Sequence, residues 1–187
     1  MVETRAPLTE SEFMALPDDG RKYELVNGEA EEVPTGFLHE AIGYWLMRLL
    51  GPVADAHGIV AGSSAGFRMA SGNIRAPDVS FTRWENVPGG RPAEGFGEGA
   101  PDLCVEIVSP SETYGEVRRK VGEYLTSGAQ QVWLLEPQDE TLTVHHADGT
   151  SRVYHADDEV DGGDLLPGFR TRISEIFKIP APAGEQP

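Results

Sequence analysis

Apolar residues along the chain follow two patterns, a helical spacing and short continuous runs. Between residues 39 and 57 they recur every three or four positions, which predicts an amphipathic helix. Residues 103–108 are instead apolar at every position except Glu106, which predicts a strand buried on both faces. A helix is expected over 114–127 and another apolar strand at 131–135. These last three segments therefore predict a strand–helix–strand unit.

Turn and cap residues divide the rest of the chain into shorter elements. The Asn27-Gly28 dipeptide predicts a tight hairpin over residues 22–33, because both turn positions need a positive φ. Thr9 and Glu12 have the spacing of a capping box at the start of a short helix. Further strands are expected at 59–63, 66–70, 74–82, 141–146 and 150–154, a glycine-rich loop at 86–101, and a last strand and turn within 165–177.

These elements predict a single α/β (α+β) domain over residues 1–179. Its helices flank a mixed central sheet, and additional hairpins lie towards both ends. The length of 187 residues suits one domain with a substantial core. Residues 180–187 are expected to form a frayed tail. The single cysteine, Cys104, excludes a disulfide framework and a multi-cysteine zinc site.

The formal net charge is −16, and its distribution limits the partners that we expect. Three segments hold the acid excess, residues 1–40, 85–116 and 136–164, whereas the other segments are slightly basic. Phosphate affinity comes mainly from Lys and Arg, so general affinity for DNA should be weak and salt-sensitive. No run approaches eighteen apolar residues and no signal-like segment opens the chain. We therefore expect no membrane span and a cytoplasmic location.

Two acidic residues on predicted strands are candidates for a functional site. An ionised Glu106 among apolar neighbours costs several kcal/mol unless it is paired, hydrogen-bonded or metal-bound. It is therefore either a partner in a buried salt bridge or a metal-binding or catalytic carboxylate. Asp78 follows Pro77 at a strand start, where it is either a turn residue or a second carboxylate. Carboxylates on two adjacent strands can hold Mg²⁺. Asp102 is a further candidate, but a capping role at its strand explains it more simply.

Three other residues complete the set of candidates. Lys120 lies on the helix after the Glu106 strand, at the edge of its buried face, so it either reaches a carboxylate pair or is solvated. Glu24 is either a third carboxylate or the cross-strand partner of a base. His39, at the start of its helix, has the position of a cap or surface residue rather than a ligand.

Several short motifs occur in a defined order along residues 9–177. They are Tyr23-Glu24-Leu25-Val26-Asn27-Gly28, His39 opening a helix, Pro77-Asp78-Val79, Asp102-Leu103-Cys104-Val105-Glu106-Ile107-Val108, Lys120, Val132-Trp133-Leu134 and Leu166-Pro167-Gly168-Phe169. The ordered set resembles the Uma-type restriction endonuclease family, which belongs to the PD-(D/E)XK nuclease superfamily.

The resemblance implies a restriction-endonuclease-like core and a site for Mg²⁺, with Mn²⁺ as a substitute. It implies that Asp78 and Glu106 are the metal ligands and that Lys120 is the catalytic lysine. Glu24 matches an early acid of the family and is expected to complete the site. The superfamily's usual lysine position is occupied here by Val108. Members of this family typically supply the lysine from the following helix instead, where Lys120 stands.

The function that we expect is metal-dependent endonucleolytic cleavage of DNA. Two alternatives remain open: a catalytically silent, nuclease-like binding or regulatory module, and a metal-dependent hydrolase of small phosphoesters. The second suits the acidic balance better, but no motif specifies it. A homodimer is also expected, through apolar surface around Trp84 or through an edge strand of the hairpin at 141–154.

Overall fold

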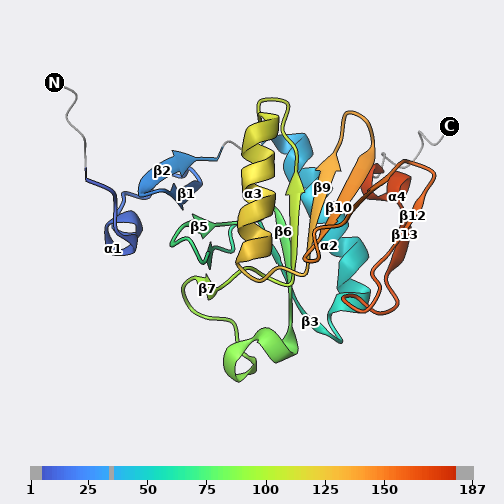
Figure 1. Cartoon of the computed structure of the whole chain (residues 1–187), viewed down its shortest axis with the longest axis horizontal. Coiled ribbons are helices and arrows are strands. Elements are labelled where there is room, and N and C mark those ends of the chain that lie inside the picture. The colour runs from blue at the N-terminus through green and yellow to red at the C-terminus, as the bar shows by residue number, and fades with distance from the viewer. Residues whose placement is uncertain (1–5, 34–35, 180–187) are drawn as a thin grey trace.

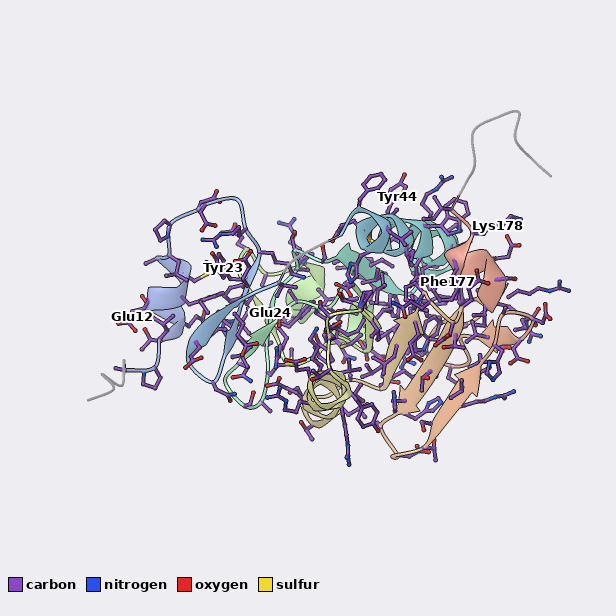
Figure 2. All side chains as sticks on the ribbon, turned by 90° about the horizontal axis from the view of Figure 1, so that it is seen from above. Glu12, Tyr23, Glu24, Tyr44, Phe177 and Lys178 are labelled. Atoms are coloured by element: carbon purple, nitrogen blue, oxygen red, sulfur yellow. The ribbon has the colours of Figure 1, made fainter. Side chains whose placement is uncertain are left out.

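Two long helices cover opposite faces of a central sheet (Figure 1; Figure 2). The computed structural model describes residues 6–33 and 36–179, so the tail expected at 180–187 lies outside the described residues. The helices are α1 (Glu10–Met14), α2 (Phe37–Ala54), α3 (Tyr114–Thr126) and α4 (Ile173–Phe177). In the view from above, α2 and α3 lie on either side of the strands, which confirms the predicted layers (Figure 2).

The central sheet has six strands in the order β11-β10-β9-β8-β6-β3. Their bounds are β3 (Gly58–Gly62), β6 (Val79–Arg83), β8 (Leu103–Ile107), β9 (Gln131–Glu136), β10 (Thr141–His146) and β11 (Ser151–Tyr154). β8 and β9 pair in parallel and α3 connects them, which confirms the predicted strand–helix–strand unit. The other neighbours in this sheet pair antiparallel, so the sheet is mixed as expected.

A second sheet of five short strands lies beside α3, in the order β2-β1-β5-β4-β7 (Figure 1). Its members are β1 (Tyr23–Val26), β2 (Glu29–Glu32), β4 (Phe67–Arg68), β5 (Ile74–Arg75) and β7 (Gly97–Glu98). The hairpin of β1 and β2 is confirmed, with φ of 53° at Asn27 and 79° at Gly28. The capping box of α1 is also present, because Glu12 accepts from the Thr9 backbone N–H at 2.8 Å.

Three segments differ from the sequence-based expectation. The strand expected at 74–82 is divided between the two sheets, because Pro77 cannot donate to a strand ladder. The glycine-rich loop at 86–101 contains β7 and the 3-10 helix Pro88–Gly90. The segment at 165–177 ends in α4, preceded by β13 (Arg170–Arg172), which pairs with the unexpected strand β12 (Glu159–Asp161).

All five residues of β8 are buried, and their side chains alternate between two clusters on opposite faces of the sheet. Val105 and Ile107 pack with Leu46 and other α2 residues on one face of the sheet. Cys104 packs with Tyr124 and other α3 residues on the opposite face. Because successive side chains of a strand point to opposite faces, Glu106 lies on the α3 side, as its pattern predicted. Within the described ranges, no helix has the length and apolar character that a bilayer crossing requires.

Candidate active site

Strand register brings the two predicted carboxylates together at one end of β8. β6 and β8 pair antiparallel with Val79 opposite Val105, and continuing this register by one residue sets Asp78 opposite Glu106. Both side chains line an open cleft of about 250 Å³, which Lys120 and Glu24 also line. All four residues that we predicted for the site therefore meet in a single cleft.

Glu106 is buried, with 6% of its surface exposed, and both of its carboxylate oxygens accept hydrogen bonds. Oε2 accepts from Lys120 Nζ at 2.8 Å, and Oε1 accepts from the Tyr124 hydroxyl at 2.6 Å. Burial raises the pKa of Glu106 to about 7, an effect that Lys120 opposes and that Asp78 and Glu24 reinforce. The buried salt bridge considered for Glu106 is therefore present, and it lies within the cleft.

Lys120 reaches the cleft from α3 and contacts two carboxylates there. Its Nζ donates to Glu106 and, also at 2.8 Å, to Oε1 of Glu112. The other oxygen of Glu112 accepts from the backbone N–H of Ser109 at 2.9 Å, which orients the carboxylate. Burial alone would lower the pKa of Lys120, but the two carboxylates outweigh it and hold the pKa above its usual range. Lys120 therefore brings a permanent positive charge into the cleft.

Asp78 presents one carboxylate oxygen to protein donors and the other to the cleft. Oδ2 accepts from the backbone N–H of Ile107 at 2.8 Å and lies 3.1 Å from Nε2 of His39. Oδ1 accepts no hydrogen bond from the residues that the structure describes, and it is not a buried atom, so it is open to the cleft. Asp78 is thus more than the turn residue that its Pro-Asp context also allowed.

The expectation that His39 is a cap or surface residue is wrong. Its side chain is only 19% exposed, and Nε2 lies 2.8 Å from the carbonyl oxygen of Ile107. Burial lowers the pKa of His39, but the neighbouring Asp78 carboxylate and the Ile107 carbonyl outweigh this and raise it above 6.5. The ring is directed inward because its position in the first turn of α2 faces the end of β8.

Glu24 is the cross-strand partner of a base, which is one of the two roles considered for it. Oε2 accepts from Arg75 of the neighbouring strand at 2.8 Å, and Oε1 accepts from the Ala76 backbone N–H at 2.9 Å. Arg75 also donates to Glu123 of α3 at 2.7 Å. The buried Glu24 thereby fixes the segment that leads into Asp78 and connects the second sheet to α3.

Replacing Glu123 by Gln is expected to remove an acid-sensitive contribution to stability. Burial would raise the pKa of Glu123, but hydrogen bonds from Ser71 and Arg75 outweigh it and hold the pKa below 4.5. The charged form therefore stabilises the folded protein above about pH 4.5, and this contribution is lost as the pH falls through the folded pKa. Urea unfolding from about pH 7 to about pH 3 should show parent and variant converging towards acid. A constant difference between them would contradict this assignment.

Asp102 lies at the opposite end of β8, away from the cleft. Its carboxylate accepts from the Arg83 backbone N–H at 2.9 Å and from the side-chain amides of Asn86 at 2.8 Å and Gln130 at 2.7 Å. These contacts fasten the start of β8 to its neighbours. The simpler, capping explanation of Asp102 therefore fits the structure better than a site role.

Four residues of the site were not predicted to belong to it: His39, which was expected to be a cap or surface residue, and Arg75, Glu112 and Tyr124. Tyr124 stands one helical turn after Lys120, and this spacing could have indicated that both side chains reach Glu106. Arg75 and Glu112 carry no comparable local pattern. Their partners are distant in the chain or depend on the path of a loop, which a single sequence does not reveal.

The side chains present are compatible with a divalent cation held by few protein ligands. Across residues 6–33 and 36–179, no three Asp, Glu, His or Cys side chains are grouped as a complete metal cage. Mg²⁺ commonly uses one or two carboxylates, with waters and substrate phosphate oxygens at its other positions. The open Oδ1 of Asp78 and the carboxylate of Glu106 on the adjacent strand meet that requirement.

Comparisons with known proteins agree on fold and family. A solved structure described as a putative nuclease belonging to DUF820, from Anabaena variabilis, matches with a TM-score of 0.81 and 24% sequence identity. The match covers 91% of this chain and 98% of that one, and it confirms the expected nuclease-like fold. No curated protein matches the chain. A family model described as "Uma2: Putative restriction endonuclease" matches residues 10–174. Because that match spans most of its length, the chain belongs to the Uma2 family of putative restriction endonucleases.

Proposed function

We propose that the protein is a divalent-metal-dependent endonuclease that hydrolyses phosphodiester bonds of DNA. The observation that carries the proposal is that Asp78, Glu106 and Lys120 meet in one cleft. Asp78 directly precedes β6, Glu106 lies on the neighbouring strand β8, and Lys120 reaches the cleft from α3. Two carboxylates can hold a divalent cation that activates a water, and a lysine can stabilise the charge that develops on the phosphate. The family description supports the same reaction class.

Each residue of the cleft has a definite chemical task in this proposal. Asp78 and Glu106 would hold Mg²⁺ or Mn²⁺, which when bound lowers the pKa of a water and neutralises charge on the phosphate. Lys120 supplies a fixed positive charge beside the scissile phosphate, because two carboxylates keep its pKa high. It therefore stabilises the transition state and orients the attacking water rather than removing its proton. Tyr124 holds the other oxygen of Glu106 in place.

The charge of the protein indicates how DNA would be bound. With 31 acidic residues against 15 basic ones, general attraction to a phosphate backbone is weak. The cation and Lys120 then provide much of the local positive charge, so cleavage should depend steeply on metal and decline with added salt. The expected homodimer and the cytoplasmic location stay predictions; β11 is an edge strand of the central sheet, and Trp84 is 44% exposed.

Asp78→Asn is expected to lower the cleavage rate at least about 10²-fold, because the variant loses the charge of the open Oδ1 towards the cation. The measurement is nicking of supercoiled plasmid DNA at low salt with Mg²⁺ or Mn²⁺, and EDTA should abolish it. Asp148→Asn is the matched control, since Asp148 is exposed in the turn between β10 and β11. Equal rates for Asp78→Asn and the parent would contradict the proposed site.

The same assay separates the two alternative functions. A small aryl phosphodiester is tested beside the plasmid. If the protein cleaves this compound but not the plasmid, it is a hydrolase of small phosphoesters. Mn²⁺ binding in calorimetry without cleavage of either substrate would instead favour a silent, nuclease-like module. Both outcomes would contradict the endonuclease proposal.

A further inference from the structure

The imidazole of His39 is a hydrogen-bond donor at the end of β8. Its Nε2 lies 2.8 Å from the carbonyl oxygen of Ile107 and 3.1 Å from Oδ2 of Asp78. A carbonyl oxygen and an ionised carboxylate can only accept hydrogen bonds, so Nε2 carries the hydrogen that lies between them. One N–H group of α2 therefore contacts both the Glu106 strand and the Asp78 carboxylate.

The other ring nitrogen cannot serve the cleft. Nδ1 of His39 is buried and has no hydrogen-bond partner among the residues that the structure describes. A histidine binds a metal through an unprotonated ring nitrogen that reaches the ion. Because Nε2 is protonated towards its two acceptors and Nδ1 is shut off from the cleft, His39 is not placed to ligate a cation or to exchange protons with substrate.

The contacts of His39 determine which oxygen of Asp78 is free. Oδ2 accepts from the backbone N–H of Ile107 at 2.8 Å as well as facing the imidazole. Oδ1 is left open to the cleft. Rotation of an aspartate carboxylate about its last torsion is soft, so one donor alone restrains it poorly. The Ile107 hydrogen bond and the close imidazole contact reach Oδ2 from different elements, and together they restrict that rotation.

We propose that His39 is a positioning residue, which holds the Asp78 carboxylate so that Oδ1 faces the cation shared with Glu106. This inference rests on the proposed metal site and adds a residue to it. Ile107 directly follows Glu106, so the imidazole also sets the two carboxylates relative to each other. Hydrogen-bond partners of metal ligands commonly change metal affinity 10–100-fold when they are removed, which gives the expected size of the effect.

Mn²⁺ affinity measured by calorimetry is the direct test, because it does not depend on cleavage. His39→Ala is expected to weaken Mn²⁺ binding about tenfold or more. His39→Gln, whose amide nitrogen can donate from a similar position, should recover most of that loss. His57→Ala is the matched control, because His57 is exposed just beyond the other end of α2.

A purely structural role of His39 is separated by two further measurements. Circular dichroism melting establishes that each variant is folded at the temperature of the titration. If His39→Ala does not fold, His39→Leu replaces it, since leucine retains apolar volume but has no donor. In the cleavage assay, the Mn²⁺ concentration for half-maximal rate should rise by the same factor as the dissociation constant, which a general loss of folded protein would not produce.

The outcomes for this inference and for the endonuclease proposal are distinct. A folded His39→Ala or His39→Leu protein with the parent's Mn²⁺ affinity would overturn the inference and leave the proposed function intact. The same would follow if a folded His39→Gln bound Mn²⁺ as weakly as the alanine variant. A third outcome is that His39→Ala loses Mn²⁺ affinity, His39→Gln recovers it, and the parent does not cleave DNA. That result would support the inference and contradict the endonuclease proposal. No Mn²⁺ binding by the parent would overturn both.

Discussion

Glu106→Gln is expected to lower the DNA cleavage rate about 10³-fold without lowering the melting temperature of the protein. A metal ion supplies several kcal/mol of charge stabilisation in the transition state, and several kcal/mol correspond to about three powers of ten in rate. Glutamine keeps the size of the side chain but removes the negative charge that would attract the cation. The variant should therefore fold normally and cleave poorly.

Stability is expected to be retained because the hydrogen-bond network around residue 106 can be rebuilt. The amide oxygen of the new glutamine can accept from Lys120, and its NH₂ group can donate to the hydroxyl oxygen of Tyr124. Lys120 keeps Glu112 as an ionic partner at 2.8 Å. Burial of the native carboxylate is itself unfavourable, which is why the pKa of Glu106 rises to about 7. Removing that burial cost offsets the lost ion pair.

Plasmid nicking with Mn²⁺ and a thermal melt of the same preparation check both halves of this prediction. Glu94→Gln, a change at an exposed glutamate, serves as the control. A parent-like cleavage rate would contradict the role proposed for Glu106. A large fall in melting temperature would show instead that the charged network of Glu106 and Lys120 mainly stabilises the fold.

Local patterns were sufficient to predict the strand that carries Glu106 and the helix that carries Lys120. The apolar run around Glu106 predicted a strand buried on both faces, and the alternation of side chains placed Glu106 on the face opposite Val105 and Ile107. Helical spacing placed Lys120 at the edge of the buried face of α3, and the side chain reaches Glu106 from there. These inferences needed only the periods of strands and helices.

Pairing between distant segments was beyond those patterns. No local feature shows that Asp78 lies opposite Glu106, because that depends on which strands are neighbours and in which register. The same holds for Arg75, which lies 51 residues along the chain from its partner Glu24 and 48 residues from its partner Glu123. The break between β5 and β6 was predictable in part, since Pro77 interrupts any ladder. The family resemblance, rather than periodicity, connected Asp78 with Glu106.

His39 illustrates why position in an element does not determine a role. A histidine in the first turn of a helix is commonly a cap or a solvated residue, and the sequence offers no reason to depart from that. Its inward direction follows from how α2 packs on the sheet, with Ile42, Leu46 and Leu50 buried in the core. That packing turns the side of the first helical turn that carries His39 towards β8. The direction of the ring is therefore a consequence of tertiary structure alone.

Arg75→Met is expected to cost about 3–5 kcal/mol of folding free energy, because it leaves buried carboxylates without their counter-ion. Arg75 is 8% exposed in its side chain, and it pairs with Glu24 at 2.8 Å and Glu123 at 2.7 Å. Methionine fills much of the volume but supplies no charge. The free energy of unfolding in urea near pH 7 measures the loss.

A second arginine with two carboxylate partners provides the matched control. Arg170 pairs with Glu159 and Asp161 across the β12–β13 ladder, but its side chain is 61% exposed. Water solvates all three charges there, so Arg170→Met should cost only a small fraction of the Arg75→Met loss. Similar losses for the two variants would contradict the importance of burial.

A double variant identifies which carboxylate causes the penalty. In Arg75→Met combined with Glu24→Gln, the buried charge at position 24 is gone, whereas the glutamine oxygen can still accept from the Ala76 backbone N–H. The double variant should therefore be more stable than Arg75→Met alone, although Glu24→Gln by itself destabilises the parent. Additive losses would show that Arg75 acts through Glu123 instead. The distinction bears on the cleft, because Glu24, unlike Glu123, accepts a hydrogen bond from the backbone two residues before Asp78.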